Sequence, residues 1–253
     1  MGQQLSAYAA ETRRLINDRL SMFVTTTDMT SYINQARRQT AKITHCLMVL
    51  VPGQSPQGIG AVPGTLVPGG AVPGANTNGG FYTIPGQEQY SYAYANGYLQ
   101  GSNAGISSVL DVVQVAVSWA SAMRPALDWM PWDDFQAYMR SYQSLMQSYP
   151  AIWTTLDRGT NSAVFLFPTP SVATEMEWLC ACAPSAIYTD DDFDALPSPF
   201  DSAVKYYAAG MAYLGMQRFG QADVMFGRFA EHLGIDRAAV DMGKVGNYYP
   251  TFG

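Results

Sequence analysis

The stretch from 197 to 233 constrains the fold most, because its pattern predicts two helices that other elements must cover. Ser198 and Pro199 are start signals for the first helix, and Gly220 is predicted to interrupt the pair. Gly234 is placed to end the second helix in the left-handed conformation. Apolar stripes this broad are not stable alone in water, so the rest of the chain must pack against them. The apolar positions at helical spacing are Val204, Tyr207, Met211 and Leu214 in the first helix and Ala222, Met225, Phe226, Phe229 and Leu233 in the second.

Two further helices are predicted before residue 47, and they are suited to cover that hairpin. The first is expected over 5–20 and the second over 29–46, with Thr27 or Asp28 as the N-cap of the second. The second helix also carries a group of basic residues. They form either a solvated face or a docking surface for an acidic partner, and the sequence leaves both readings open. These residues are Arg37, Arg38 and Lys42.

A β-rich module is predicted over 47–186, between the two helical regions. Short apolar runs bounded by glycine and proline indicate strands over 47–51, 90–94, 109–119, 151–155, 163–167 and 175–182, with one helix over 131–149. We therefore expect an α+β fold, in which N- and C-terminal helices form a bundle with an inserted antiparallel β-rich module and an extended C-terminal arm. The expected divisions are the helices of 1–46, the module of 47–186, an acidic linker with the helical hairpin over 187–234, and the arm of 235–253.

An unusual loop is predicted over 52–80, inside the β-rich module. Three tandem Val-Pro-Gly pentads begin at Val62, Val67 and Val72. Pro-Gly pairs favour type II turns, so the segment has no capacity for a packed core of its own. A loop of this length in a compact domain is either functional or disordered. A tolerated surface insertion and an interaction role both remain open.

Charged residues are scarce and unevenly distributed. They make up 13% of the chain, about half the usual share, and the net charge is −6. Residues 1–46 carry a net charge of +3, which leaves −9 for the remainder. An acidic body argues against a surface that grips nucleic-acid phosphates, and it suits a wall along which DNA slides. No lysine or arginine lies between Lys42 and Arg124, and the alternating tyrosines of this region, Tyr90, Tyr92 and Tyr94, are expected to face other subunits.

No catalytic, metal or cofactor site is predicted, and we do not expect an enzyme. His45 and His232 lie near helix ends, where an imidazolium is favoured. Cys180 and Cys182 share one strand face without a matching Cys or His cluster. The acidic linker has the alternate spacing of a calcium loop, but Ala195 replaces the turn glycine. No apolar stretch is long enough to span a membrane, and no secretory signal is expected. The aspartates of the linker pattern are Asp190, Asp192, Asp194 and Asp201.

Three passages that together span nearly the whole chain carry a resemblance to a known family. The first is YINQARR at 32–38, and the second is PAIW at 150–153 with VFLFPTP at 164–170. The third begins with TDD at 189–191 and continues through LPSPFD at 196–201, YYAA at 206–209 and QRF at 217–219. In this order and spacing they resemble the head–tail adaptor (connector) proteins of tailed bacteriophages. The loop at 52–80 departs from the family pattern, so no role is carried over to it.

The resemblance implies a structural virion protein, made in the bacterial host cytoplasm and located at the head–tail junction. Such proteins form a ring, commonly of twelve copies, under the portal protein. The ring prolongs the DNA channel, through which DNA passes without sequence-specific binding. It also offers a platform to the next tail protein, a nozzle, tail tube or stopper. The C-terminal arm would reach the portal, and its aromatic anchors here would be Tyr248, Tyr249 and Phe252.

Two other classes of function remain open from the sequence. One stretch is similar to a single tetratricopeptide unit, which would make the chain a helical-repeat binding module. Its matching residues are Leu214-Gly215, Phe219, Ala222 and Phe226. About three such units are needed for a stable stack, and only one is visible in the sequence. The third class is a carbohydrate-binding β-domain or an enzyme, with the tyrosine-rich strands as a stacking surface.

Overall fold

The computed structural model describes residues 3–18, 20–51, 82–102, 105–118, 125–142, 147–156, 162–192 and 194–234. The chain divides into two compact units. The helical unit comprises Met1–Met48, Asn103–Leu110 and Ala181–Met242, and the β unit comprises Val49–Ser102, Asp111–Cys180 and Gly243–Gly253. Helices and mixed sheets both occur among the described residues, so the predicted α+β fold class is confirmed. The predicted loop at 52–80 and the predicted arm at 235–253 lie outside the described residues.

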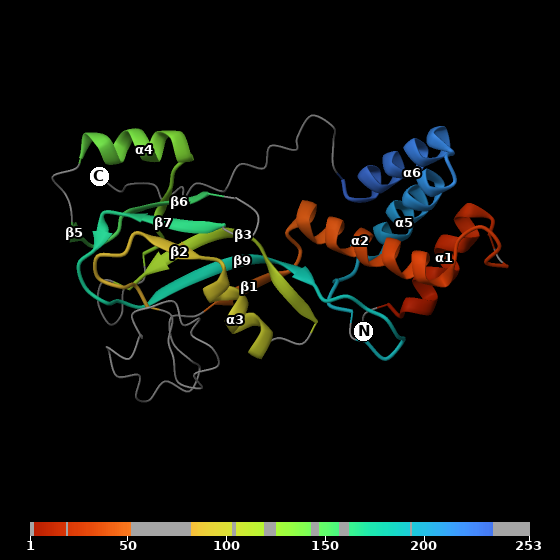
Figure 1. Ribbon diagram of the computed structural model, residues 1–253, viewed down its shortest axis with the longest axis horizontal. Helices are drawn as coiled ribbons and strands as arrows, with labels where there is room; N and C mark the ends of the chain where they lie inside the picture. The colour runs from red at the N-terminus through yellow and green to blue at the C-terminus, as the bar shows by residue number, and fades with distance from the viewer. Residues whose placement is uncertain are drawn as a thin grey trace. The chain divides into compact units, whose positions relative to one another are not determined.

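Helices from the two ends of the sequence pack together in the helical unit (Figure 1). Helix α5 contacts α6, α2 and α1, so the predicted hairpin is covered by the N-terminal helices as its apolar stripes require. Gly210 of α5 allows a close approach, because a Cβ built there would lie 2.7 Å from the ring of Phe226 in α6. The four helices are α1 (Leu5–Ile16), α2 (Thr26–Thr44), α5 (Asp201–Gly215) and α6 (Phe219–His232).

Local signals set the helix ends, and three of them differ from the predicted positions. Helix α1 ends four residues early because Asn17 adopts the left-handed conformation, with φ at 58°. The N-cap of α2 is Thr25, whose hydroxyl accepts a hydrogen bond from the Asp28 N–H at 3.1 Å. The hairpin is interrupted at Gln217, with φ at 59°, and Gly220 lies inside the first turn of α6. Gly234 has the predicted positive φ, at 65°.

Among the described residues, the strands form three sheets, with the orders β1-β9-β3, β2-β7-β6-β4 and β5-β8. The β6–β7 and β2–β7 pairs are antiparallel as predicted, but β4–β6 and β5–β8 are parallel. The chain passes through helix α4 between β4 and β6, and a helical crossover returns a strand in the parallel direction. The elements are β1 (Met48–Val51), β2 (Gln89–Ser91), α3 (Ala93–Ser102), β3 (Ile106–Val117), β4 (Asp128–Trp129), α4 (Trp132–Ser141), β5 (Gln147–Ser148), β6 (Ile152–Leu156), β7 (Ala163–Phe167), β8 (Thr169–Pro170) and β9 (Met176–Pro184).

Helix α4 closes a small aromatic core on the β2-β7-β6-β4 sheet. Phe135 of α4 is fully buried against Ile152 and Phe167, and its ring meets that of Phe167 edge-on. Trp132 stacks on Phe135 and meets Phe165 edge-on. The predicted helix over 131–149 is therefore shorter than expected, since it ends at Ser141.

Candidate docking surface on the helical unit

The predicted docking residue Arg37 is buried, which corrects the expectation that it lies on a surface. Its side chain is 1% exposed and pairs with the fully buried carboxylate of Asp194. Both the Nε and the Nη2 of Arg37 donate to Asp194 Oδ1, at 3.1 and 2.6 Å. A charge pair without water is stable only when the remaining donors and acceptors are also satisfied. Arg37 meets this condition, because its Nη1 donates to Ser185 O at 2.7 Å and to Asn34 Oδ1 at 3.1 Å.

The Arg37–Asp194 ion pair holds the segment that precedes α5 in the chain, which contains Asp194, against α1 and α2. The Tyr8 hydroxyl of α1 donates to Asp194 Oδ2 at 2.7 Å. Burial is the main cause that raises the pKa of Tyr8 above its usual range, and this hydrogen bond is the second. The Leu196 N–H donates to Asp194 Oδ1 at 3.1 Å. On α2, the Asn34 side chain exchanges two hydrogen bonds with the backbone of Ile187. The buried polar groups named here therefore hold the segment in position.

The calcium-like spacing of the acidic linker has a different explanation in the structure. Asp190 Oδ1 accepts the Ser6 N–H at 2.7 Å, at the first turn of α1. Asp192 Oδ2 accepts the N–H groups of Tyr188 and Thr189 at 2.6 and 2.8 Å, which closes a tight turn. These hydrogen bonds lower the pKa of Asp192. Within the described ranges, no three His, Cys, Asp or Glu residues converge on a point where a metal ion could bind.

The other two basic residues of α2, Arg38 and Lys42, are exposed. They remain available as docking residues, and a role for them stays a prediction. The predicted arm anchors Tyr248, Tyr249 and Phe252 lie outside the described residues.

The three tyrosines predicted to face other subunits are placed differently by the structure. Tyr90 is 1% exposed and Tyr92 is 6% exposed, and Tyr94 is half-buried. The predicted strand ends at Ser91, and the tyrosine pattern continues into α3. The Tyr90 hydroxyl accepts the Ile84 N–H and donates to Gln87 O, and burial raises the pKa of Tyr90 to about 12. The expectation of an exposed tyrosine-rich strand is therefore wrong, because the chain's own core takes up two of the three side chains.

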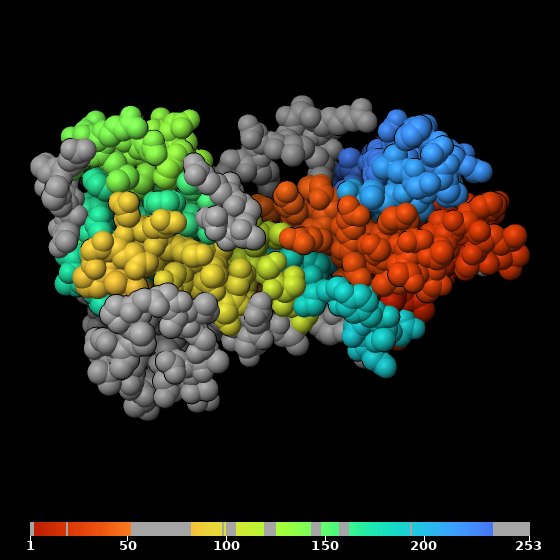
Figure 2. All heavy atoms as spheres, viewed as in Figure 1, coloured from red at the N-terminus to blue at the C-terminus, as the bar shows by residue number. Residues whose placement is uncertain are grey.

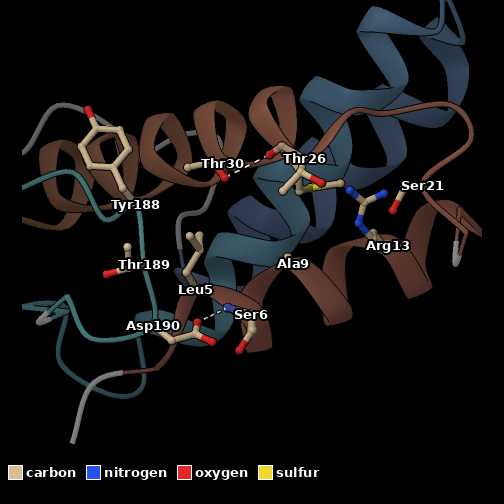
Figure 3. Close-up of a pocket in the computed structure, with 11 residues that line it drawn as sticks. Leu5, Ser6, Ala9, Arg13, Ser21, Thr26, Thr30, Tyr188, Thr189 and Asp190 are labelled. Carbon is tan, nitrogen blue, oxygen red and sulfur yellow. Dashed lines mark hydrogen bonds between the residues drawn. The ribbon is translucent and has the colours of Figure 1, made fainter.

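An open groove of about 310 Å³ lies between α1, α2 and the segment at 188–190 (Figure 3). Leu5 and Ala9 of α1 and Met29 of α2 supply apolar lining, and hydroxyl groups of Thr26 and Thr30 lie along one side. Its charged groups already have partners, since Asp190 accepts the Ser6 N–H and Arg13 pairs with Asp18. The groove therefore has no uncommitted charge among these groups with which to orient a small charged ligand.

The connection between α1 and α2 exposes three large apolar side chains. The exposed fractions of Leu20, Met22 and Phe23 are 80%, 76% and 67%. The turn between α5 and α6 exposes Leu214 and Phe219, at 37% and 64%. These five residues are called the bundle end below.

Both connections lie at the same end of the helical unit. The Tyr213 hydroxyl near the end of α5 donates to the carbonyl of Leu15 near the end of α1, at 3.2 Å. Figures 1 and 2 show the α1–α2 connection and the α5–α6 turn at the right-hand side of the view, with the two helix pairs side by side. The two connections, and the exposed apolar side chains that they carry, therefore lie at one end of the helical unit.

A buried carboxylate fixes the backbone of the α1–α2 connection. Asp18 is 2% exposed and accepts the N–H groups of Met22, Phe23 and Val24, the closest at 2.7 Å. Arg13 Nη1 donates both to Asp18 Oδ2 at 3.3 Å and to Val24 O at 3.1 Å. Burial alone would raise the pKa of Asp18, but the three N–H groups and Arg13 outweigh it and lower that pKa.

The bundle end was not predicted, because the first helix was expected to extend through residue 20. A usable signal was present: Leu20, Met22 and Phe23 form an apolar cluster directly before the capping residues of α2. These residues do not belong to the apolar stripe of either helix, so their large apolar side chains indicate a separate, exposed surface.

The described part of the chain contains no helix that is long and apolar enough to span a membrane. Comparison with known proteins gives no family, since no protein-family model matches the chain and no curated protein matches it.

Proposed function

We propose that this protein is a structural virion component of the head–tail adaptor class. The observation that carries the proposal is the bundle end, where large apolar side chains stand on a backbone fixed by the buried Asp18. An ordered, exposed apolar surface is typical of a protein that is covered by other proteins when it functions. The scarcity of charge and the order of the three passages that resemble the adaptor family support the same class.

In this proposal the protein forms a ring, with twelve copies as the expected number, under the portal protein. The ring continues the DNA channel and receives the next tail protein, a nozzle, tail tube or stopper. The net charge of −9 outside residues 1–46 supports a lumen past which DNA moves without adhering. The exposed Arg38 and Lys42 and the C-terminal residues Tyr248, Tyr249 and Phe252 are the proposed contacts with neighbouring virion proteins.

Two observations bear on the alternative functions. Helices α5 and α6 pack on α1 and α2, which are not a second copy of the same repeat, so the geometry does not favour a helical-repeat module. Tyr90 and Tyr92 are buried, so they offer no stacking surface to a carbohydrate. The adaptor class is therefore the better supported of the three.

The test is to mix the purified protein with the portal protein of the phage that encodes it. We expect the two to co-sediment and negative-stain images to show a ring of this protein on one face of the portal. A chain lacking residues 236–253 should sediment with the portal more weakly, because the proposed aromatic anchors are removed. If the full chain neither binds the portal nor forms a ring beside it, the proposal is wrong.

A further inference from the structure

We infer that the bundle end is a self-complementary docking surface, and that in the free protein it pairs with the bundle end of a second copy around a two-fold axis. The inference uses the same surface as the proposed function, but it concerns the purified chain alone and is tested without the portal protein. It starts from one juxtaposition: Leu20, Met22 and Phe23 on one connection and Leu214 and Phe219 on the other, at one end of four packed helices.

The area of this surface fits a two-fold pair. If a fully exposed large apolar side chain presents about 200 Å², the five residues together expose roughly 650 Å² in each copy. Pairing two such ends would bury on the order of 1,300 Å², which lies within the range of stable, specific interfaces. A contiguous apolar area of more than a few hundred Å² is uncommon on isolated monomers.

Among the described residues that flank the bundle end, two exposed side chains are positive and two are negative, which favours a second copy as the occupant. Exposed Arg14 and Arg218 lie in the last turn of α1 and at the N-cap of α6. Exposed Asp28 lies in the first turn of α2, and exposed Asp223 is the fifth residue of α6. Two positive and two negative side chains on one surface can pair with their own copies when that surface meets itself. An anionic membrane would instead call for an excess of positive charge, which these four residues do not supply.

The fixed backbone makes the surface ready to dock. Asp18 holds three consecutive N–H groups, and Thr25 caps α2 through Asp28 directly after them. Val24 and Met29, at the positions that staple the start of α2, are buried. Little backbone entropy remains to be lost when Met22 and Phe23 are covered, so the ordering cost on docking is limited to their side chains. The free protein would thereby cover the surface that the proposed function offers to other virion proteins.

The first experiment measures the mass of the full chain by light scattering across a dilution series, beside the double variant Met22→Ser/Phe23→Ser. We expect a dimer for the unaltered chain and a dissociation constant about thirtyfold higher or more for the variant. Both side chains are exposed and the backbone is held by Asp18, so the variant should keep its helical circular dichroism. The control is Tyr188→Ser, which removes an equally exposed aromatic side chain of the same unit, outside the bundle end. A monomeric unaltered chain, or a control that dissociates equally, overturns the inference.

The second experiment tests the two-fold geometry by disulfide trapping in a Cys46→Ser background, because Cys46 is only partly buried. Met22→Cys should give a covalent dimer on mild oxidation, since a two-fold axis brings the same residue of each copy together. Tyr188→Cys should stay monomeric. A head-to-tail assembly, in which Met22→Cys does not couple to itself, overturns the inference. A membrane as the occupant would also overturn it. In that case the unaltered chain sediments with vesicles of equal parts phosphatidylcholine and phosphatidylserine, the double variant does not, and no dimer of the unaltered chain is found.

Discussion

Replacing Arg37 by methionine is the sharpest test of how the helical unit is held together. The change keeps an unbranched, apolar side chain of similar reach and removes only the guanidinium. Four hydrogen bonds disappear, two to Asp194 Oδ1 and one each to Asn34 Oδ1 and Ser185 O. Asp194 keeps the Tyr8 hydroxyl and the Leu196 N–H as donors, but it has no positive partner in a site without solvent.

The expected loss follows from that isolated charge. Removing one partner of a buried pair typically lowers the free energy of unfolding by about 3–5 kcal/mol, a large part of the stability of an ordinary domain. Most of this loss comes from leaving the Asp194 carboxylate buried without a positive partner.

The assay is urea unfolding followed by far-ultraviolet circular dichroism, which reports the helices. Arg38→Met is the matched control, because Arg38 is the next residue of the same helix and is exposed. It should change the unfolding free energy by no more than about 0.5 kcal/mol. Arg37→Met combined with Asp194→Leu should recover part of the loss, since no buried charge remains but the Tyr8 hydroxyl and the Leu196 N–H lose their acceptor. A loss below about 1 kcal/mol for Arg37→Met alone would mean that the pair behaves like a surface salt bridge, and the reasoning would be refuted.

Two further stability predictions concern the α1–α2 connection and the contact between α5 and α6. Asp18→Asn should lower the unfolding free energy by about 1–3 kcal/mol at neutral pH, because an amide cannot accept all the N–H bonds or pair with Arg13. Since the folded pKa of Asp18 is lowered, its contribution is present above the unfolded pKa of about 4 and is lost as the pH falls through the folded pKa, so urea titrations of the two proteins should converge in acid. Gly210→Ala should destabilise by about 1–3 kcal/mol in thermal melts, because its Cβ meets the Phe226 ring at 2.7 Å. Gly227→Ala should stabilise by about 0.5–1 kcal/mol, because the added Cβ meets open space inside α6; equal effects at the two glycines would contradict this account.

Local periodicity predicted the helices of the helical unit and most strands of the β unit, because these depend on neighbours three or four, or two, residues apart. The tyrosines at 90–94 show where this reasoning fails. Their alternation is compatible with a strand, but only 89–91 pair with β7, and α3 begins at Ala93. The partner strand decides which residues of such a run form a strand. The local sequence of the run does not identify that partner strand.

Arg37 shows a second limit, which lies in how the helical stripe of α2 was read. The buried face of α2 includes Ile33, Ala36 and Thr40, and Arg37 is placed on the same face by its spacing. A charged residue on an apolar face requires a buried partner, so the spacing alone could have indicated one. The identity of that partner could not be predicted locally, since Asp194 lies 157 residues away.

The buried charges and the exposed apolar bundle end of the helical unit are two consequences of the same arrangement. Asp18, Arg37 and Asp194 are almost completely buried in a chain that has few charged residues, and each one fixes a segment outside the helices. Asp18 holds the α1–α2 connection, and the Arg37–Asp194 pair holds the segment before α5. A connection fixed by apolar packing would need its large side chains turned inward. The carboxylate of Asp18 holds the backbone of the α1–α2 connection, so Met22 and Phe23 are left free to point outward. The apolar surface that another protein can cover is therefore a result of where this charge is buried.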